Sequence, residues 1–212
     1  MACSTDRSRW IVGALLSACA LIVQDVPAHG RAFDVAAQDV YLRLEGKDAE
    51  AVNEFQRRLT EFDAVRQHLD ASLPPLVVTP DRAAIIRVIA AHHGALLSAR
   101  HSARQGDIFS ARVADRFRDW IRASLHGIPP SVFLAMITEP DGPPIARPLV
   151  NGSYPPGAAR STMPPELLQL FPSLPAHLEY RFIDRDLILW DSHANLIIDV
   201  IPNAFGPSGQ RR

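Results

Sequence analysis

The stretch that decides the fold is LEYRFIDRDLILWDSHANLIIDVI, residues 178–201. It holds three short runs in which large apolar residues alternate with polar ones, a period that places every second side chain on the same face of a β-strand. Asp184-Arg185 and residues 192–195 separate the runs, so we predict a three-stranded antiparallel meander. The alternation assigns Asp186, Asp191 and Asp199 to the polar side, and the opposite face needs a covering partner.

Upstream of this block, apolar residues recur every three or four positions, the period of an amphipathic helix. Residues 34–70 form the first predicted helix, with a break near Gly46. In the second helix, Thr79 is the expected N-cap and Pro80 the first helical residue. Ser110 is the expected N-cap of the third. Each helix has one apolar stripe, which predicts a hairpin or three-helix unit.

A proline-rich stretch joins the two parts. Twelve of the 18 prolines fall between residues 129 and 175, which excludes a long helix or a central strand. We expect short helices at residues 131–138 and 164–171, the second capped by Thr162. Such a stretch can be a ligand for SH3-type domains, but the apolar residues that interrupt it favour an ordered wrap.

The predicted fold is therefore α+β: an N-terminal helical hairpin or three-helix unit, a proline-rich wrap, and a C-terminal three-stranded antiparallel meander packed on the helices. We expect the meander to leave an open sheet edge. The predicted boundaries are a signal peptide at 1–28, a helical region at 29–127, a proline-rich connecting region at 128–176, a small β-module at 177–205 and a disordered tail at 206–212.

The first 28 residues have the pattern of a bacterial export signal. Arg7 and Arg9 precede an apolar run at residues 10–23, and Val26 and Ala28 stand at the −3 and −1 positions of a cleavage site. The run is shorter than the roughly 20 residues that span a bilayer. We therefore expect a periplasmic or secreted protein.

A second processing signal overlaps the first. Leu16-Ser17-Ala18-Cys19 fits a lipobox, in which Cys19 would be lipidated. The apolar run continues through residues 20–23, which favours simple cleavage over lipidation, and an uncleaved anchor is the third alternative. We expect contact with the membrane only through the signal or a lipid, and one acyl chain anchors only marginally.

Composition limits the chemistry of the mature chain. Removal of residues 1–28 takes away both cysteines, Cys3 and Cys19, and with them any disulfide or thiolate ligand. The remaining 20 basic and 21 acidic side chains nearly balance. A basic surface for nucleic acid is therefore not expected.

The histidines are the first candidates for a metal site, which on a helix needs two ligands at i and i+4. Leu97 occupies the position four residues after His93, and His101 is about 12 Å further along the axis at 1.5 Å per residue. His92 shares a face with Leu96, so we expect it in the core. We assign no metal-ligating, cofactor-binding or catalytic residue and expect no cofactor.

The polar run at residues 100–107, RHSARQGD, is the stretch of the chain that looks most like a functional site. A Gly-Asp loop with arginines nearby can hold an anionic group. Alternatively, Asp107 or Ser110 caps the next helix and Gly106 makes the turn. The four candidate residues of this polar cluster are Arg100, His101, Arg104 and Asp107.

Residues 180–183, 184–189 and 196–201 together resemble the C-terminal module of the periplasmic nickel/cobalt-homeostasis (RcnB-like) family and of related small envelope proteins of unknown function. Those proteins share a YR-aromatic strand, an acidic turn, an apolar strand and a final strand of the type (I/V)-x-(D/E)-(V/I)-(I/L). The resemblance covers about 25 of the 212 residues. It implies an envelope location and a β-module, and it carries over no metal site, because no ligand motif is shared. The whole chain also looks like uncharacterised exported proteins that pair Gln-Gly-Asp-Ile-Phe, here residues 105–109, with this tail.

Motifs of known chemistry are absent from the sequence. It contains no G-x-S-x-G, no H-E-x-x-H, no P-loop and no Rossmann glycine pattern. The first hypothesis is therefore a non-catalytic envelope protein that binds another protein or a surface. The second is a periplasmic protein that binds a metal or small ligand in metal homeostasis or stress, and the third is an unrecognised hydrolase.

Overall fold

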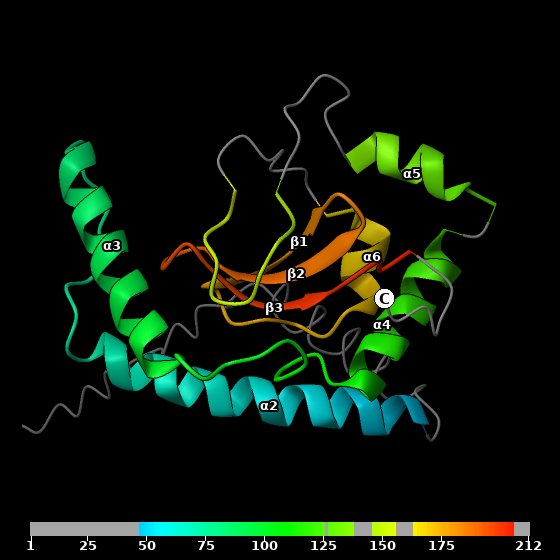
Figure 1. The fold of residues 1–212 in the computed structure, drawn as a ribbon, viewed down its shortest axis with the longest axis horizontal. Coiled ribbons are helices and arrows are strands. Elements are labelled where there is room, and N and C mark those ends of the chain that lie inside the picture. Colours follow the sequence, from blue (N-terminus) through cyan, green and yellow to red (C-terminus); the bar gives the residue numbers. More distant parts are fainter. Residues whose placement is uncertain (1–46, 126, 138–145, 156–162, 206–212) are drawn as a thin grey trace, which may run out of the picture. The chain divides into compact units, whose positions relative to one another are not determined.

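The C-terminal meander is the centre of the fold. In the computed structural model, strands β1 (Leu178–Ile183), β2 (Asp186–Asp191) and β3 (Leu196–Ile201) form one antiparallel sheet in the order β1-β2-β3 (Figure 1). The helices are α2 (Lys47–Asp70), α3 (Arg82–Ala99), α4 (Ala111–Ser124), α5 (Pro130–Ile137) and α6 (Pro165–Leu170). The predicted α+β class is confirmed.

The structure describes residues 47–125, 127–137, 146–155 and 163–205. The chain divides into two units, residues 1–39 and 40–212, and every described residue belongs to the second. The predicted signal peptide, Cys19, the predicted helix before residue 47 and the predicted tail at 206–212 lie outside the described residues. None of the helices in the described ranges combines the length and apolarity needed to cross a bilayer.

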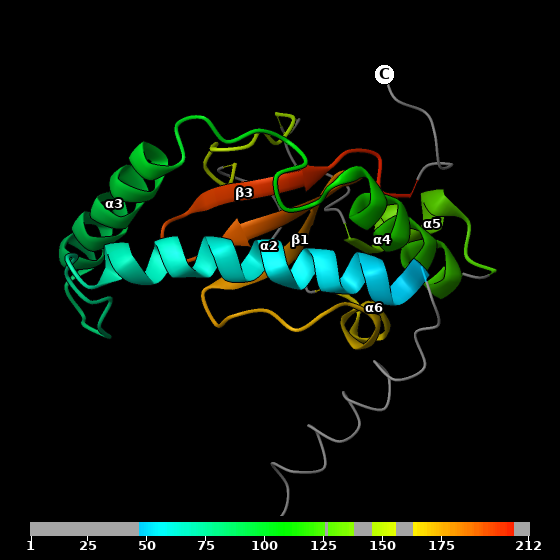
Figure 2. The same cartoon turned by 90° about the horizontal axis from the view of Figure 1, so that it is seen from below.

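One face of the sheet shares a core with the helices. Phe55 of α2 and Phe117 of α4 lie 5.4 Å apart between ring centroids, and Tyr180 of β1 packs against both. The three-helix unit is organised around α2, which contacts α3 and α4 (Figure 2). The same apolar cluster includes Leu187 and Leu189 of β2, so helices and sheet bury each other's apolar faces.

The other face of the sheet is also buried, by part of the proline-rich region. Tyr154 packs on Trp190 with ring centroids 4.9 Å apart, and Val150 joins the same cluster. The main chain of Asn151 and Gly152 exchanges hydrogen bonds of 2.9 and 2.8 Å with Ile197. This segment therefore covers part of the outer edge of β3, one of the two edges of the sheet.

The polar assignments of Asp191 and Asp199 were wrong, because both side chains are fully buried. Asp191 lies four residues after Leu187, so strand alternation itself places it on the core face. Asp199 reaches that face through a β-bulge: Leu189 pairs with Asp199 and Trp190 with Ile197, so Ile198 is the extra residue. A bulge shifts the following side chains to the opposite face of the strand.

Helix ends agree with the predictions only in part. Ser110 caps α4 as expected, with its Oγ 3.4 Å from the N–H of Val113. The predicted cap of α3 was wrong by two residues. Asp81 is the N-cap and accepts hydrogen bonds from two backbone N–H groups, while Thr79 accepts one from the Asp81 N–H. Pro164 stands at the N-cap of α6 without a side-chain hydrogen bond, and Thr162 lies outside the described residues.

Candidate functional site

The four residues of the predicted polar cluster do not converge on one site. Arg100 turns inward, where its Nη2 donates to Ile198 O at 2.7 Å and its guanidinium lies 5.1 Å from the centroid of the Phe62 ring. Burial lowers its pKa, an effect that Asp199 and Asp107 oppose. The other three cluster residues are exposed: His101, Arg104 and Asp107.

The loop that follows Arg100 is held by a buried carboxylate. Asp199 accepts hydrogen bonds from the backbone N–H groups of Gly106 (3.0 Å), Ile108 (2.8 Å) and Phe109 (2.7 Å). Burial raises the pKa of Asp199, and these backbone donors oppose the rise. We call this arrangement the Asp199 clamp; the N–H groups that a Gly-Asp loop could offer to an anion are already bound to a carboxylate of the same chain.

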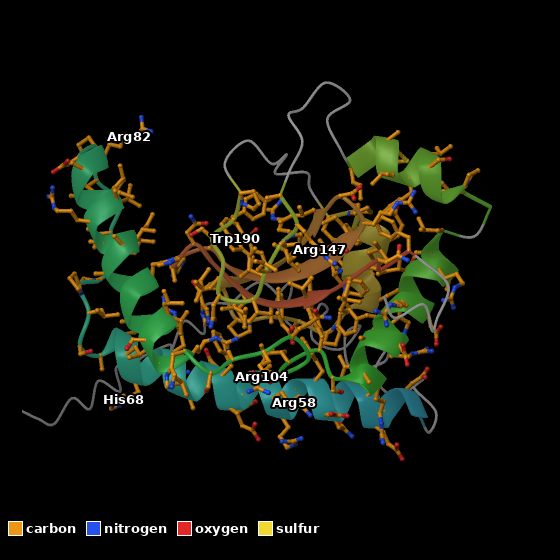
Figure 3. The ribbon with its side chains drawn as sticks, viewed as in Figure 1. Arg58, His68, Arg82, Arg104, Arg147 and Trp190 are labelled. Carbon is orange, nitrogen blue, oxygen red and sulfur yellow. The ribbon has the colours of Figure 1, made fainter. Side chains whose placement is uncertain are left out.

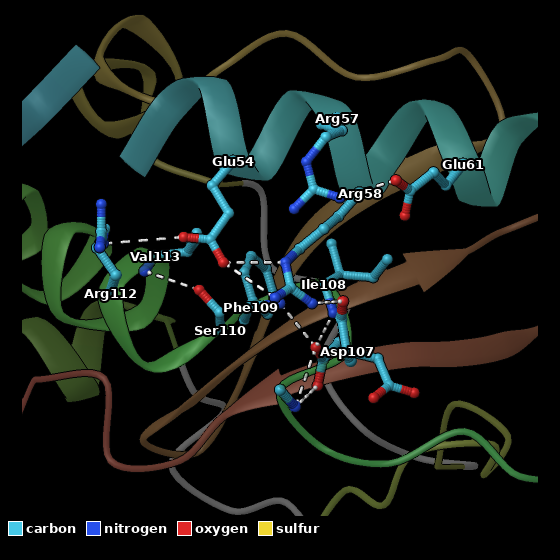
Figure 4. Close-up of polar contacts among 12 residues, drawn as sticks. Glu54, Arg57, Arg58, Glu61, Asp107, Ile108, Phe109, Ser110, Arg112 and Val113 are labelled. Atoms are coloured by element: carbon cyan, nitrogen blue, oxygen red, sulfur yellow. Dashed lines mark hydrogen bonds and ion pairs between the residues drawn. The ribbon is translucent and has the colours of Figure 1, made fainter. Parts of the chain in front are cut away.

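The exposed side of the loop is tied to α2 (Figure 4). Arg58 donates to Asp107 O at 2.7 Å and forms an ion pair with Glu54 at 3.0 Å. A hydrogen bond from Ser110 lowers the pKa of Glu54. The Asp107 carboxylate accepts from the N–H of Arg104 at 2.8 Å, so it closes a turn and does not cap α4. The loop is thus a structural connection between α2, β3 and α4.

A second polar group, which the sequence analysis missed, lies between α2 and β2. Arg66 and Asp191, both almost completely buried, are 2.9 Å apart, and Arg66 also forms an ion pair with Asp70. Asp191 accepts a further hydrogen bond from Ala194 N. A buried charge pair is stable only when its remaining hydrogen-bonding groups are satisfied, and these contacts serve that purpose. We call Arg66, Asp70 and Asp191 the buried charge network.

Histidines border this network without forming a ligand set. His92 is buried as predicted, with Nε2 2.8 Å from Pro74 O and Nδ1 3.2 Å from Asp70. His177 has its Nε2 3.7 Å from Asp63, and burial lowers its pKa. Across the described ranges, no group of three or more His, Cys, Asp or Glu side chains is placed to hold a metal ion.

An exposed apolar surface is the remaining candidate for a functional site. It is formed by residues 71–81 and α3, which together we call the arm. His92 and Leu96, both in the second half of α3, are its only buried residues. Figures 1 and 3 show α3 leading from its Arg82 end, away from the sheet, toward the end of α2. Large apolar side chains of the arm are left open to solvent; they are Leu76, Val77, Val78, Ile86 and Leu97.

The composition of α3 does not match this exposure. Five of its 18 residues have a polar side chain: Arg82, Arg87, His92, His93 and Ser98. The rest are apolar or small on every side of the helix, and Ile86 is 55% exposed. A helix that is apolar all round is normally covered all round. The exposed apolar side chains of the arm therefore make it the candidate interaction surface.

A second exposed apolar group lies on and near α5, where Val132 and Met136 are open to solvent. Residues 126 and 138–145 on either side of α5 are outside the described ranges, so the surroundings of α5 are incomplete. The arm is flanked by described residues on both sides, which makes it the better-defined candidate.

Comparison of the chain with protein-family models, with curated proteins and with solved structures gave no match. The resemblance of residues 178–201 to the RcnB-like module therefore stays a prediction. The candidate site rests on the residues of the arm themselves.

Sequence reasoning predicted a helix at α3, with an N-cap that was wrong by two residues, but missed the arm as a site. It identified the stripe that contains His92 and Leu96 and did not examine the opposite side of the same helix. The available signal was the scarcity of polar residues in residues 82–99, where an exposed helix normally has several.

Proposed function

We propose that this chain is an exported protein of the bacterial envelope that acts as a non-catalytic protein-binding module, and that the arm is its binding surface. The observation that carries the proposal is the exposed side of α3, which is apolar where a solvated helix would be charged. Apolar burial contributes about 25 cal/mol per Å². A partner that covers this side would therefore be stabilised by the apolar area that it buries.

The distribution of charge supports the same surface. Arginines and carboxylates form ion pairs along α2 and α4, including Arg57 with Glu61 and Arg122 with Asp119. On the arm, the ion pair between Arg87 and Asp81 is long, at 3.8 Å. The core of a protein interface is depleted in charge and its rim is polar, and the arm fits the core part of this description.

The test places a photo-crosslinking amino acid at Ile86 in cells that export the full chain. The control carries the same amino acid at Gln56, an exposed residue of α2. We expect a discrete adduct of higher mass from the Ile86 position and none from Gln56. The absence of an adduct at Ile86, or equal adducts at both positions, would contradict the proposal.

Export is tested on the same cells by fractionation and by the mass of the N-terminal peptide. We expect the protein in the periplasmic or secreted fraction with His29 as its first residue. An acylated Cys19 at the N-terminus would identify a lipoprotein and leave the envelope location intact. A cytoplasmic protein that begins at Met1 would refute export.

A further inference from the structure

We infer that the partner of the arm is a second copy of this chain, bound through an antiparallel pairing of α3 with α3 of the second copy. The inference rests on the proposed function and specifies its partner. It is drawn from the order of side chains along the open side of α3. The five residues of that side are all exposed: Ala83, Ile86, Ala90, Gly94 and Leu97.

These five residues form one stripe. Their spacings are three, four, four and three positions, which keep them on one face of an α-helix and are the spacings of helix-packing seams. The series of spacings reads the same in both directions from Ala90. A two-fold axis at Ala90 therefore brings the stripe into register with an antiparallel copy of itself.

The same two-fold axis places each large side chain of the stripe opposite a small residue of the second copy. In the antiparallel pair, Ile86 faces Gly94 of the second copy and Leu97 faces Ala83 of the second copy. Ala90 faces its own equivalent on the axis. Each large side chain thus meets a small one, which lets the helices approach evenly. A parallel pair would set Ile86 against Ile86 and Gly94 against Gly94, with crowding at one level and a gap at the next.

The contacts within one chain do not explain why position 94 is a glycine. It lies in the interior of α3, and a Cβ at this position would meet no atom within 4 Å. Glycine in a helix interior is less stable than alanine by about 1 kcal/mol. Neither crowding nor backbone geometry in the described chain requires it. A neighbouring helix that places Ile86 over this position does require a residue without a side chain.

Charge also favours the antiparallel orientation. The last turn of α3 has no basic side chain to offset the negative end of the helix dipole. In the antiparallel pair, Arg82 lies level with Ser98 of the second copy, beside that end. Arg82 is at the N-terminal end of α3 (Figure 3) and has no ion-pair partner among the described residues. Each copy would therefore supply the cation that the other lacks.

Cysteine cross-linking tests the pairing in the full chain with Cys3 and Cys19 replaced by serine. We expect Ala90→Cys to form a covalent dimer on oxidation, because position 90 lies on the axis. Ile86→Cys should link to Gly94→Cys when the two variants are mixed. Ile86→Cys alone should not link, since two copies of residue 86 are about 12 Å apart along the helices. Self-linking at residue 86 would indicate a parallel pair and overturn the inference.

Sedimentation equilibrium measures the same association without cross-links. The unmodified chain should be a dimer at high concentration, and Gly94→Leu should be a monomer because its side chain occupies the place of Ile86. Arg82→Glu should weaken the dimer, while Arg104→Glu, an exposed change outside the arm, should not. A chain that stays monomeric at every concentration overturns the inference, as does a dimer that Gly94→Leu leaves intact.

The photo-adduct at Ile86 separates this inference from the proposed function. An adduct with twice the mass of the chain supports both. An adduct with a different protein retains the binding function and overturns the second copy as the partner. The absence of any adduct at Ile86 overturns both.

Discussion

Helices α3 and α4 follow one another along the chain but differ in how much of their apolar surface is buried. In α4, Val113, Phe117 and Ile121 enter the shared core, and charged residues occupy the other side. In α3, only His92 and Leu96 are buried, yet nearly every side of the helix is apolar or small. The sequence of α4 thus matches the surroundings that this chain provides. The sequence of α3 matches a helix with more cover than this chain provides.

The comparison predicts a large difference between the two helices when apolar side chains are removed. Phe117→Ala should lower the free energy of unfolding by about 3–5 kcal/mol, because it leaves a cavity among five aromatic rings. Ile86→Ala should change it by less than about 0.5 kcal/mol at low protein concentration, where α3 is unpartnered. Urea unfolding of both variants measures the difference. A loss of several kcal/mol for Ile86→Ala would show that the arm is packed in solution.

A second comparison is between two carboxylates that bind backbone N–H groups of the loop at residues 104–109. Asp199 of β3 is buried, and Asp107 of the loop itself is exposed. Asp199→Asn should cost about 1–3 kcal/mol, because an amide nitrogen then confronts backbone N–H donors of the Asp199 clamp. Asp107→Asn, which keeps an oxygen facing the Arg104 N–H, should cost less than about 0.5 kcal/mol. Thermal unfolding of the two variants measures both stability losses. Equal costs would mean that the clamp is not the anchor of the loop.

Three polar residues, Ser110, Asp191 and Asp199, show which structural features the sequence could predict and which it could not. Ser110 was recognisable as a cap because capping depends on residue type and a few neighbours. The burial of Asp191 was also readable, since strand parity places it with Leu187 and Leu189. Asp199 was not readable, because its direction depends on a bulge at Ile198, and a bulge leaves no certain mark in the sequence.

The same reasoning explains the outcome for the predicted polar cluster. Arg100 and Asp107 are close in sequence and polar, which is all that the prediction used. The direction of Arg100 depends on a contact made across almost a hundred positions, its hydrogen bond to Ile198 O. Local composition cannot determine contacts of that range. The apolar composition of α3, by contrast, was readable in the sequence, whereas its exposure required the structure.

The burial of His177, which lies beside the buried charge network, should make stability fall in mild acid. The folded pKa of His177 is lowered from 6.5 by burial beside Arg66 and His193, opposed by Asp191 and Asp63. The unfolded chain therefore binds the proton more readily, so stability present above pH 6.5 is lost as the pH falls below it. Raised pKa values at Asp186 and Asp199 act in the opposite direction.

His177→Gln isolates this contribution. The melting temperature should fall less between pH 7.5 and pH 5 in the variant than in the unmodified chain, and the effect should be smaller than that of Asp199→Asn. Thermal melts at several pH values in one buffer series give the comparison. Identical pH profiles for the two proteins would assign the acid sensitivity to other groups.

The smallest expected effect is the most informative about α3. Gly94→Ala should raise the free energy of unfolding by about 0.4–1 kcal/mol in dilute protein, because the helix gains and a Cβ meets open space. Dimerisation opposes this gain: the unmodified chain should become more stable as its concentration rises through the dissociation constant. Alanine at position 94 crowds Ile86 of the second copy and should weaken that dependence. The melting temperatures of the two proteins should therefore converge with increasing concentration. A constant advantage for Gly94→Ala at all concentrations would mean that α3 has no use for its glycine in self-association.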